Sequence, residues 1–101
     1  MEINVSKESG AVMLEMSGNL DSIGSGELQA AIKEILAKEP EADLALDFAS
    51  VAFISSAGLR VLLLAMKKLS SAGHSMKLLN VSEPVKKIFS MTGFSAVFDI
   101  V

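Results

Sequence analysis

Short segments in which apolar and polar residues alternate are interspersed along this chain with longer segments in which apolar residues recur every three or four positions. Alternation is typical of half-buried strands, and the longer repeat is typical of helices. Residues 3–5 and 12–16 alternate on either side of a turn at residues 7–10, which predicts an antiparallel hairpin. The rest of the chain must therefore be built around an initial two-stranded unit.

Three helices and three further strands are predicted after the hairpin. The helices are bounded by residues that favour helix ends, namely Asp21 or Ser22 with Pro40, Ser56 with Gly73, and Ser82 with Gly93. The predicted strands are residues 44–48, 75–80 and 97–100. Helices that connect neighbouring strands make those strands parallel, through right-handed crossovers. We therefore expect the α/β fold class, with a mixed sheet of four or five strands and helices packed on it.

The length of the chain, 101 residues, supports one hydrophobic core, so a single domain over residues 1–101 is expected. The longest uninterrupted apolar run, residues 61–66, is far below the roughly 20 residues that span a bilayer. The first residues have neither a basic start nor a continuous apolar stretch, so they do not predict a secretory signal. We expect a protein that contains no membrane segment.

Charge and cysteine content narrow the class of partner. The net charge is −3 and the isoelectric point is near 5.0, so the basic footprint of a nucleic-acid-binding protein is absent. The absence of cysteine excludes thiolate nucleophiles and cysteine metal sites, and it fits a reducing cytoplasm. We expect a cytoplasmic protein that binds a protein partner or an uncharged ligand.

Two adjacent serines, Ser55 and Ser56, lie in a turn of small residues between a predicted strand and the second predicted helix. The start of a helix has unpaired backbone N–H groups and the positive end of the helix dipole. A phosphate on a serine there would meet favourable electrostatics. The turn therefore predicts a phosphate site at the tip of a helix.

An enzymatic hypothesis rests on Ser56 and Gly58, which match half of the Gly-x-Ser-x-Gly turn of hydrolases. Ile54, however, occupies the position of the first glycine. His74, the single histidine of the chain, follows the far end of the predicted helix, roughly 25 Å from Ser56 at 1.5 Å per residue. This distance argues against a Ser-His-Asp triad, and we interpret His74 as a surface residue of a turn. No enzymatic activity is expected.

Other candidate sites are weaker. The glycines of residues 22–26 lack the lysine of a phosphate-binding loop and predict a flexible start to the first helix. The acidic residues have no metal-ligand spacing, and Asp43 and Asp47 are interpreted as solubilising residues at strand ends. No metal or cofactor is expected.

The polar side of the second predicted helix contains one leucine. On a helical wheel that side consists of Ser56, Arg60, Leu64, Lys67 and Lys68. Leu64 either lies under a neighbouring helix or is an apolar anchor for a partner, flanked by Arg60 and Lys67. Periodicity alone leaves both alternatives open.

Three segments together resemble the STAS domains of the anti-sigma factor antagonist family. Residues 51–59, Val-Ala-Phe-Ile-Ser-Ser-Ala-Gly-Leu, are similar to a signature in which a strand ends in Asp-Ser-Ser/Thr-Gly-Leu. Residues 17–21, Ser-Gly-Asn-Leu-Asp, resemble the Gly-x-Leu-Asp segment that follows the second strand of the family. Residues 82–94 resemble the last helix and its cap. The resemblance extends over nearly the whole chain and implies a STAS-like fold.

The resemblance also implies a function and a site. It makes Ser56 the residue that accepts phosphate from an anti-sigma factor with serine-kinase activity, and Asp21 the aspartate that lies close to it. Ser55 occupies the place of the signature aspartate. The implied cycle is partner switching, in which the unphosphorylated protein, a monomer when alone, binds the anti-sigma factor and frees a sigma factor. Phosphorylation ends binding until a PP2C-type phosphatase restores the serine.

The family resemblance and the polar side of the second helix together predict a set of partner-binding residues, which are Asp21, Ser55, Ser56, Gly58, Arg60, Leu64 and Lys67. A second hypothesis is a non-switching STAS scaffold, an accessory subunit of a transporter or a signalling complex, in which the serine turn only packs against a partner. The serine in place of the signature aspartate favours that alternative.

Overall fold

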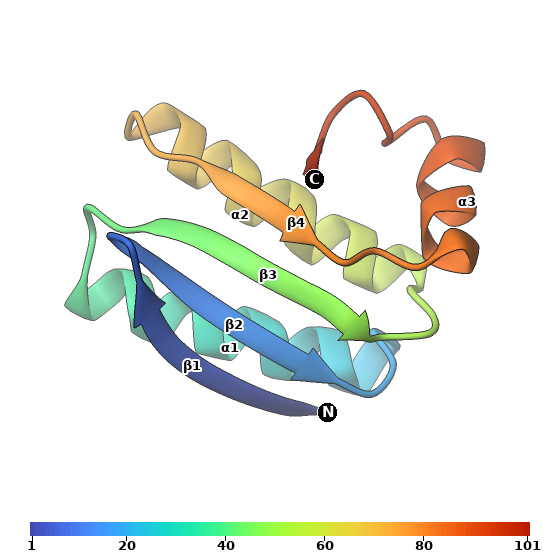
Figure 1. Ribbon diagram of the computed structural model, residues 1–101, viewed down its shortest axis with the longest axis horizontal. Helices are drawn as coiled ribbons and strands as arrows, with labels where there is room; N and C mark the ends of the chain where they lie inside the picture. Colours follow the sequence, from blue (N-terminus) through green and yellow to red (C-terminus); the bar gives the residue numbers. More distant parts are fainter.

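Five strands and three helices follow one another in the predicted order in the computed structural model, which describes residues 1–101 (Figure 1). The elements are β1 (Glu2–Glu8), β2 (Ala11–Ser17), α1 (Ser22–Lys38), β3 (Asp43–Ser50), α2 (Ser56–Ser71), β4 (Met76–Leu79), α3 (Glu83–Met91) and β5 (Asp99–Ile100). The strands form one sheet in the order β1-β2-β3-β4-β5, with β1 and β2 antiparallel and the other pairs parallel. The predicted hairpin and parallel crossovers are confirmed.

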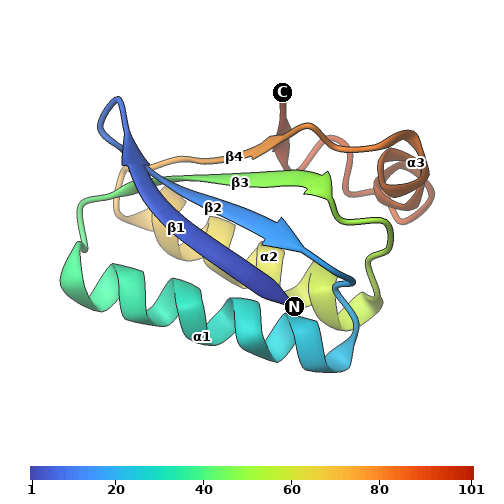
Figure 2. The ribbon, with the colours of Figure 1, turned by 60° about the horizontal axis from the view of Figure 1, so that its bottom comes forward.

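The two long helices cover one face of the sheet, and α3 lies beyond one end of the strands (Figure 2). Leu14, Leu46 and Phe48 of β2 and β3 are fully buried, and the residues that alternate with them are exposed or half-buried except Ala45, which is also buried. Their alternates, such as Glu15 and Asp47, face away from the helices. The core therefore lies between the sheet and the pair α1 and α2, and the other face of the sheet is open.

The apolar residues of α1 recur at helical spacing and pack into the core, since Leu28, Ile32, Ile35 and Leu36 are all buried. On its outer side, Lys38 Nζ donates a hydrogen bond to Glu34 at 3.1 Å, one turn earlier. None of the helices combines the length and the apolar character that crossing a bilayer requires.

The last predicted strand is shorter than expected. We predicted residues 97–100, whereas β5 contains Asp99 and Ile100. The N–H groups of Val97 and Phe98 bond to the carbonyl oxygen of Phe94 in a turn, so these residues are not available to the sheet. Phe98 is buried against the rings of Phe89 and Phe94, and aromatic packing therefore determines this end of the chain.

Candidate functional site

The first turns of α1 and α2 are held together by the residues that precede them. Leu20 N–H donates to the carbonyl oxygen of Phe53 at 3.0 Å, and Ser55 N–H donates to the carbonyl oxygen of Leu20 at 2.8 Å. Leu20 and Ile54 form a parallel bridge beyond the ends of β2 and β3. A short continuation of the sheet thus aligns the two helix N-termini.

Ser55 is the N-cap of α2 and also bonds to the segment before α1. Its Oγ accepts a hydrogen bond from Gly58 N–H at 3.3 Å and donates one to the carbonyl oxygen of Leu20 at 2.8 Å. A serine hydroxyl has one proton to donate, and that proton is engaged here. The hydroxyl of Ser55, which is half-buried, therefore joins two segments of the fold.

Ser56 is the first residue of α2 and is exposed. The first turn of α2 contains no acidic residue, so no carboxylate within that turn neutralises the positive end of the helix dipole. An anion at this position would meet the unpaired N–H groups of the first turn. Of the two serines, Ser56 has the accessible hydroxyl.

Asp21 is the N-cap of α1, so of the two predicted caps, Asp21 and Ser22, the first is confirmed. Its Oδ1 accepts a hydrogen bond from Gly24 N–H at 2.8 Å, which fixes the carboxylate at the start of the helix. Asp21 directly follows Leu20, the residue bonded to Ser55, and it is exposed. The structure therefore brings Asp21 to the same end of the helix pair as the serine turn.

The glycines near these caps allow close contact. A Cβ on Gly24 would lie 2.2 Å from the carbonyl oxygen of Asn19. A Cβ on Gly58 would lie 2.7 Å from Ile54 Cγ1 and 3.0 Å from the carbonyl oxygen of Leu20. The prediction of a flexible start to α1 was wrong, because residues 22–26 are regular helix and Gly24 is required by contact with the preceding loop.

Arg60 and Leu64 of α2 lie beside a hollow between the N-terminal halves of the two long helices. The hollow has a volume of about 300 Å³ and is also lined by Ser22, Gly26 and Gln29 of α1. The side chain of Leu64 is 48% exposed, so the alternative in which it lies buried under a neighbouring helix is wrong. Lys67 is exposed but lines no hollow between the helices.

Sequence reasoning missed the contribution of α1 to this surface. Ser22, Gly26, Gln29 and Lys33 recur at helical spacing along α1 and border the space between the helices. The only sign of this surface in the sequence is that small and polar residues repeat every three or four positions. They show no apolar periodicity, so a search for amphipathic faces passes over them.

His74 lies at the opposite end of α2 from Ser56, which rules out contact between the two side chains. Its Nε2 lies 2.9 Å from Glu41 Oε2 and its Nδ1 lies 3.4 Å from Asp43 Oδ1. The hydrogen bond to Glu41 raises the pKa of His74 above its ordinary value. The hydrogen bond from Ser75 N–H, at 2.8 Å, is the main reason that the pKa of Asp43 is lowered.

Asp43 and Asp47, predicted to be solubilising residues, therefore have structural roles as well. Asp43 joins His74 and the start of β4, and Asp47 Oδ1 accepts hydrogen bonds from Ala49 N–H at 2.9 Å and from Asn80 Nδ2 at 3.2 Å. Both carboxylates connect neighbouring parts of the sheet.

Comparison with known proteins gives a family match along almost the whole chain. Residues 2–101 match the family described as the STAS domain. The anti-sigma-B factor antagonist of Bacillus subtilis is similar to this chain, with 27% identity over 100 residues that cover 99% of this chain and 90% of that protein.

Solved structures with the same fold include the anti-sigma factor antagonist SpoIIAA in its unphosphorylated form. The TM-score is 0.82 at 21% identity, over 99% of this chain and 88% of that one. The phosphorylated form of SpoIIAA, a Bacillus cell fate determinant, matches with a TM-score of 0.74 at 20% identity, over 99% of this chain and 91% of that one. At these identities, both comparisons show that this chain has the same fold as SpoIIAA.

Proposed function

Because this chain belongs to the STAS domain family, we propose that it is an anti-sigma factor antagonist regulated by phosphorylation of Ser56. Unphosphorylated, it binds an anti-sigma factor that is also a serine kinase, and phosphorylated it releases that partner. A PP2C-type phosphatase removes the phosphate and restarts the cycle, which takes place in the cytoplasm. The protein thus acts by binding and not by catalysis.

The observation that carries this proposal is the different use of the two serines. Ser55 Oγ is engaged with Leu20 and Gly58, whereas Ser56 is exposed at the first position of α2. A kinase needs an accessible hydroxyl whose modification the fold tolerates. Ser56 meets both conditions, because its phosphate would lie at the favourable end of the helix dipole.

The proposed switch acts at the surface of the protein. A phosphoserine adds about −1.5 to −2 charges and three acceptor oxygens. At the start of α2 this charge leaves the fold intact, so its cost falls on a partner seated against the turn through charge repulsion and desolvation. A hundredfold loss of affinity requires only about 2.7 kcal/mol, which one buried charge supplies.

The test is a phosphorylation and binding assay with the purified protein and an anti-sigma factor kinase of the source organism. With ATP, mass spectrometry should find one phosphate on Ser56, and a PP2C-type phosphatase should remove it. The phosphorylated protein should bind the kinase at least about tenfold more weakly than the unmodified one. Ser56→Ala should bind without being modified, and Ser56→Glu should bind poorly.

Two results would contradict the proposal. Phosphate on Ser55 in the wild type, retained in Ser56→Ala, would show that the acceptor is the other serine. Equal affinity of the modified and unmodified protein for the kinase would show that Ser56 does not control binding.

The non-switching scaffold is a second candidate function, favoured by one specific contact. Ser55 Oγ donates a hydrogen bond to the carbonyl oxygen of Leu20, and an ionised aspartate at this position has no proton with which to do so. A kinase that reads an aspartate before its target serine would find a neutral hydroxyl turned inward. Absence of any phosphate in the assay above, together with binding to a membrane transporter or a signalling complex, would favour this candidate.

A further inference from the structure

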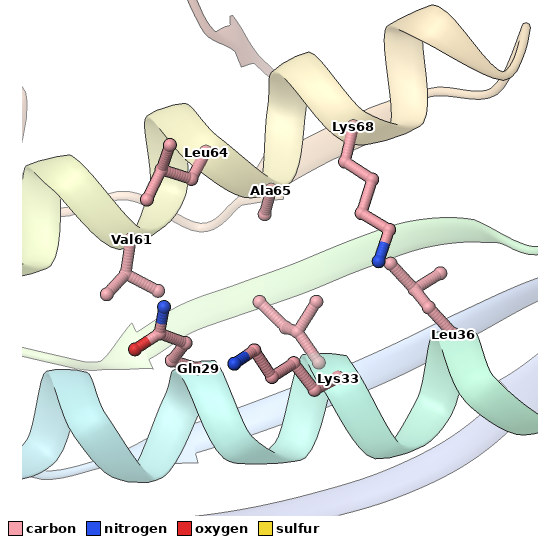
Figure 3. A pocket seen from close by; sticks show the side chains of 8 residues that line it. Gln29, Lys33, Leu36, Val61, Leu64, Ala65 and Lys68 are labelled. Carbon is pink, nitrogen blue, oxygen red and sulfur yellow. The ribbon is translucent and has the colours of Figure 1, made fainter.

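An apolar groove continues from the serine end of the molecule along the space between α1 and α2. Its floor is formed by Ile32 and Leu36 of α1 and by Val61 and Ala65 of α2, and its volume is about 90 Å³. Lys33 and Lys68 stand at its rims, and Figure 3 shows the Lys68 side chain extending toward Leu36. We call this space, together with the hollow beside Arg60, the α1–α2 groove.

The two parts of the α1–α2 groove are continuous, because Gln29, Val61 and Leu64 line both of them. From Ser22 to Leu36 the groove follows about four turns of α1, roughly 21 Å at 1.5 Å per residue. It is a trough between two helices that begin side by side. A third helix of about four turns has the length and shape to lie in such a trough.

The charges along the groove have one sign. Arg60, Lys33 and Lys68 are the charged residues that line it, and none of them makes an ion pair within the protein. The chain as a whole has a net charge of −3, so this basic strip differs from the rest of the molecule. A partner segment with carboxylates on its flanks would complement it.

The size and charge of the groove argue against two other occupants. Its apolar part, about 90 Å³, is well below the roughly 300–1,000 Å³ typical of small-molecule sites and accepts single side chains, and the hollow beside Arg60, about 300 Å³, only reaches the lower limit of that range. A second copy of this chain could offer α3, which lies outside the α1 and α2 layer, but α3 presents Lys86 and Lys87 to solvent. Those lysines would repel the basic rims.

We propose that the α1–α2 groove binds an acidic amphipathic helix of the protein partner. The apolar face of that helix packs on Leu64, Val61 and Ile32, and its carboxylates pair with Lys33 and Lys68. This inference rests on the proposed function, because the partner is taken to be the anti-sigma factor that engages Ser56. It extends the contact surface from the serine turn by several turns of helix.

The test measures binding of the anti-sigma factor that phosphorylates the wild-type protein. The double variant Lys33→Glu/Lys68→Glu should bind about tenfold or more weakly, with a weaker dependence on salt, because two rim charges are reversed. Lys87→Glu, on the exposed side of α3, is the control for a charge reversal outside the groove and should bind like the wild type. In the wild-type complex, amide hydrogen exchange should slow in residues 29–36 and 61–68, which is a readout that needs no variant.

The outcomes separate the inference from the proposed function. Equal affinity of the double variant and Lys87→Glu, with unchanged exchange in residues 29–36, would overturn the groove as a docking site while Ser56-dependent binding stands. Self-association of the free protein through the groove, detected by sedimentation and lost in the double variant, would also overturn it. If no anti-sigma factor kinase binds or modifies the wild type, the proposed function fails and the inference fails with it.

Discussion

The side chain of Ser55 donates a hydrogen bond to the backbone carbonyl of Leu20 at 2.8 Å and thereby connects residues that are 35 positions apart. The same oxygen caps α2, and the carbonyl of Leu20 also accepts the Ser55 N–H. One small side chain therefore aligns the starts of both long helices.

Ser55→Ala should lower the free energy of unfolding by about 1–2 kcal/mol, since it removes a helix cap and a side-chain hydrogen bond. Urea denaturation followed by circular dichroism measures this loss. Ser56→Ala is the matched control, because the exposed Ser56 should change stability by no more than about 0.5 kcal/mol. The reverse order of the two effects would show that Ser56 is the residue that caps α2.

Gly58→Ala should destabilise the protein by roughly 1–3 kcal/mol, because the new methyl group would lie 2.7 Å from Ile54 Cγ1 and 3.0 Å from the Leu20 carbonyl oxygen. Gly26→Ala is the control, since a Cβ there meets no atom within 4 Å. In the helix it should stabilise by up to about 1 kcal/mol. Thermal unfolding of both variants checks the prediction, and a Gly58→Ala protein as stable as the wild type would contradict it.

Leu64→Lys should leave the unfolding temperature nearly unchanged, because Leu64 is 48% exposed and surface substitutions shift stability by about 0.5 kcal/mol or less. If Leu64 is the partner anchor, the same change should weaken binding of the anti-sigma factor by about 2 kcal/mol or more. Titration calorimetry with both proteins measures this difference. A stable variant with full affinity would move the interface toward Asp21 and remove Arg60, Leu64 and Lys67 from it.

The His74 cluster should make stability depend on pH near neutrality. The folded-state pKa of His74 is raised above its ordinary value of 6.5, first by the hydrogen bond to Glu41. Its contribution is therefore fully present below pH 6.5 and is lost as the pH rises through the raised pKa of the folded state. The wild type should exceed His74→Gln in urea midpoint at about pH 5.5, and by less at about pH 8.5.

Asp43 also contributes to stability, but its contribution depends on pH in the direction opposite to that of His74. Its pKa is lowered, mainly by the hydrogen bond from Ser75 N–H, so its stabilisation is present above 3.8 and is lost as the pH falls through the lowered value. The His74 comparison at about pH 5.5 lies above this range, where Asp43 keeps its charge. A difference between the wild type and His74→Gln that does not change with pH would contradict the His74 prediction.

The order of the elements could be predicted because each leaves a local pattern in the sequence. The alternation along β3 and the helical repeat of Leu28, Ile32 and Ile35 are properties of neighbouring residues. The short β5 could not be predicted, because Phe98 is withdrawn from the sheet by packing on Phe89, a residue of another element. The same holds for Gly24, whose role depends on contact with Asn19.

The candidate site could be predicted in part, for a similar reason. The turn before a helix indicated the pair Ser55 and Ser56, the family resemblance chose Ser56 between them, and the structure shows Ser56 exposed at the start of α2. The role of Ser55 could not be predicted from the sequence, because its hydroxyl donates to the carbonyl oxygen of Leu20, which lies in a distant segment. The contribution of Gln29 and Lys33 also depends on which helix lies beside α2, and this is a property of the tertiary fold.

The bridge between Leu20 and Ile54 has a consequence for quality control in the cell. The bridge requires the ends of β2 and β3 to lie side by side, so an unfolded chain does not present Ser56 at the tip of a capped helix beside Asp21. A partner that recognises this arrangement would respond only to completed molecules. Newly made or damaged copies would then add nothing to the signal, and the regulatory output would track the concentration of folded protein.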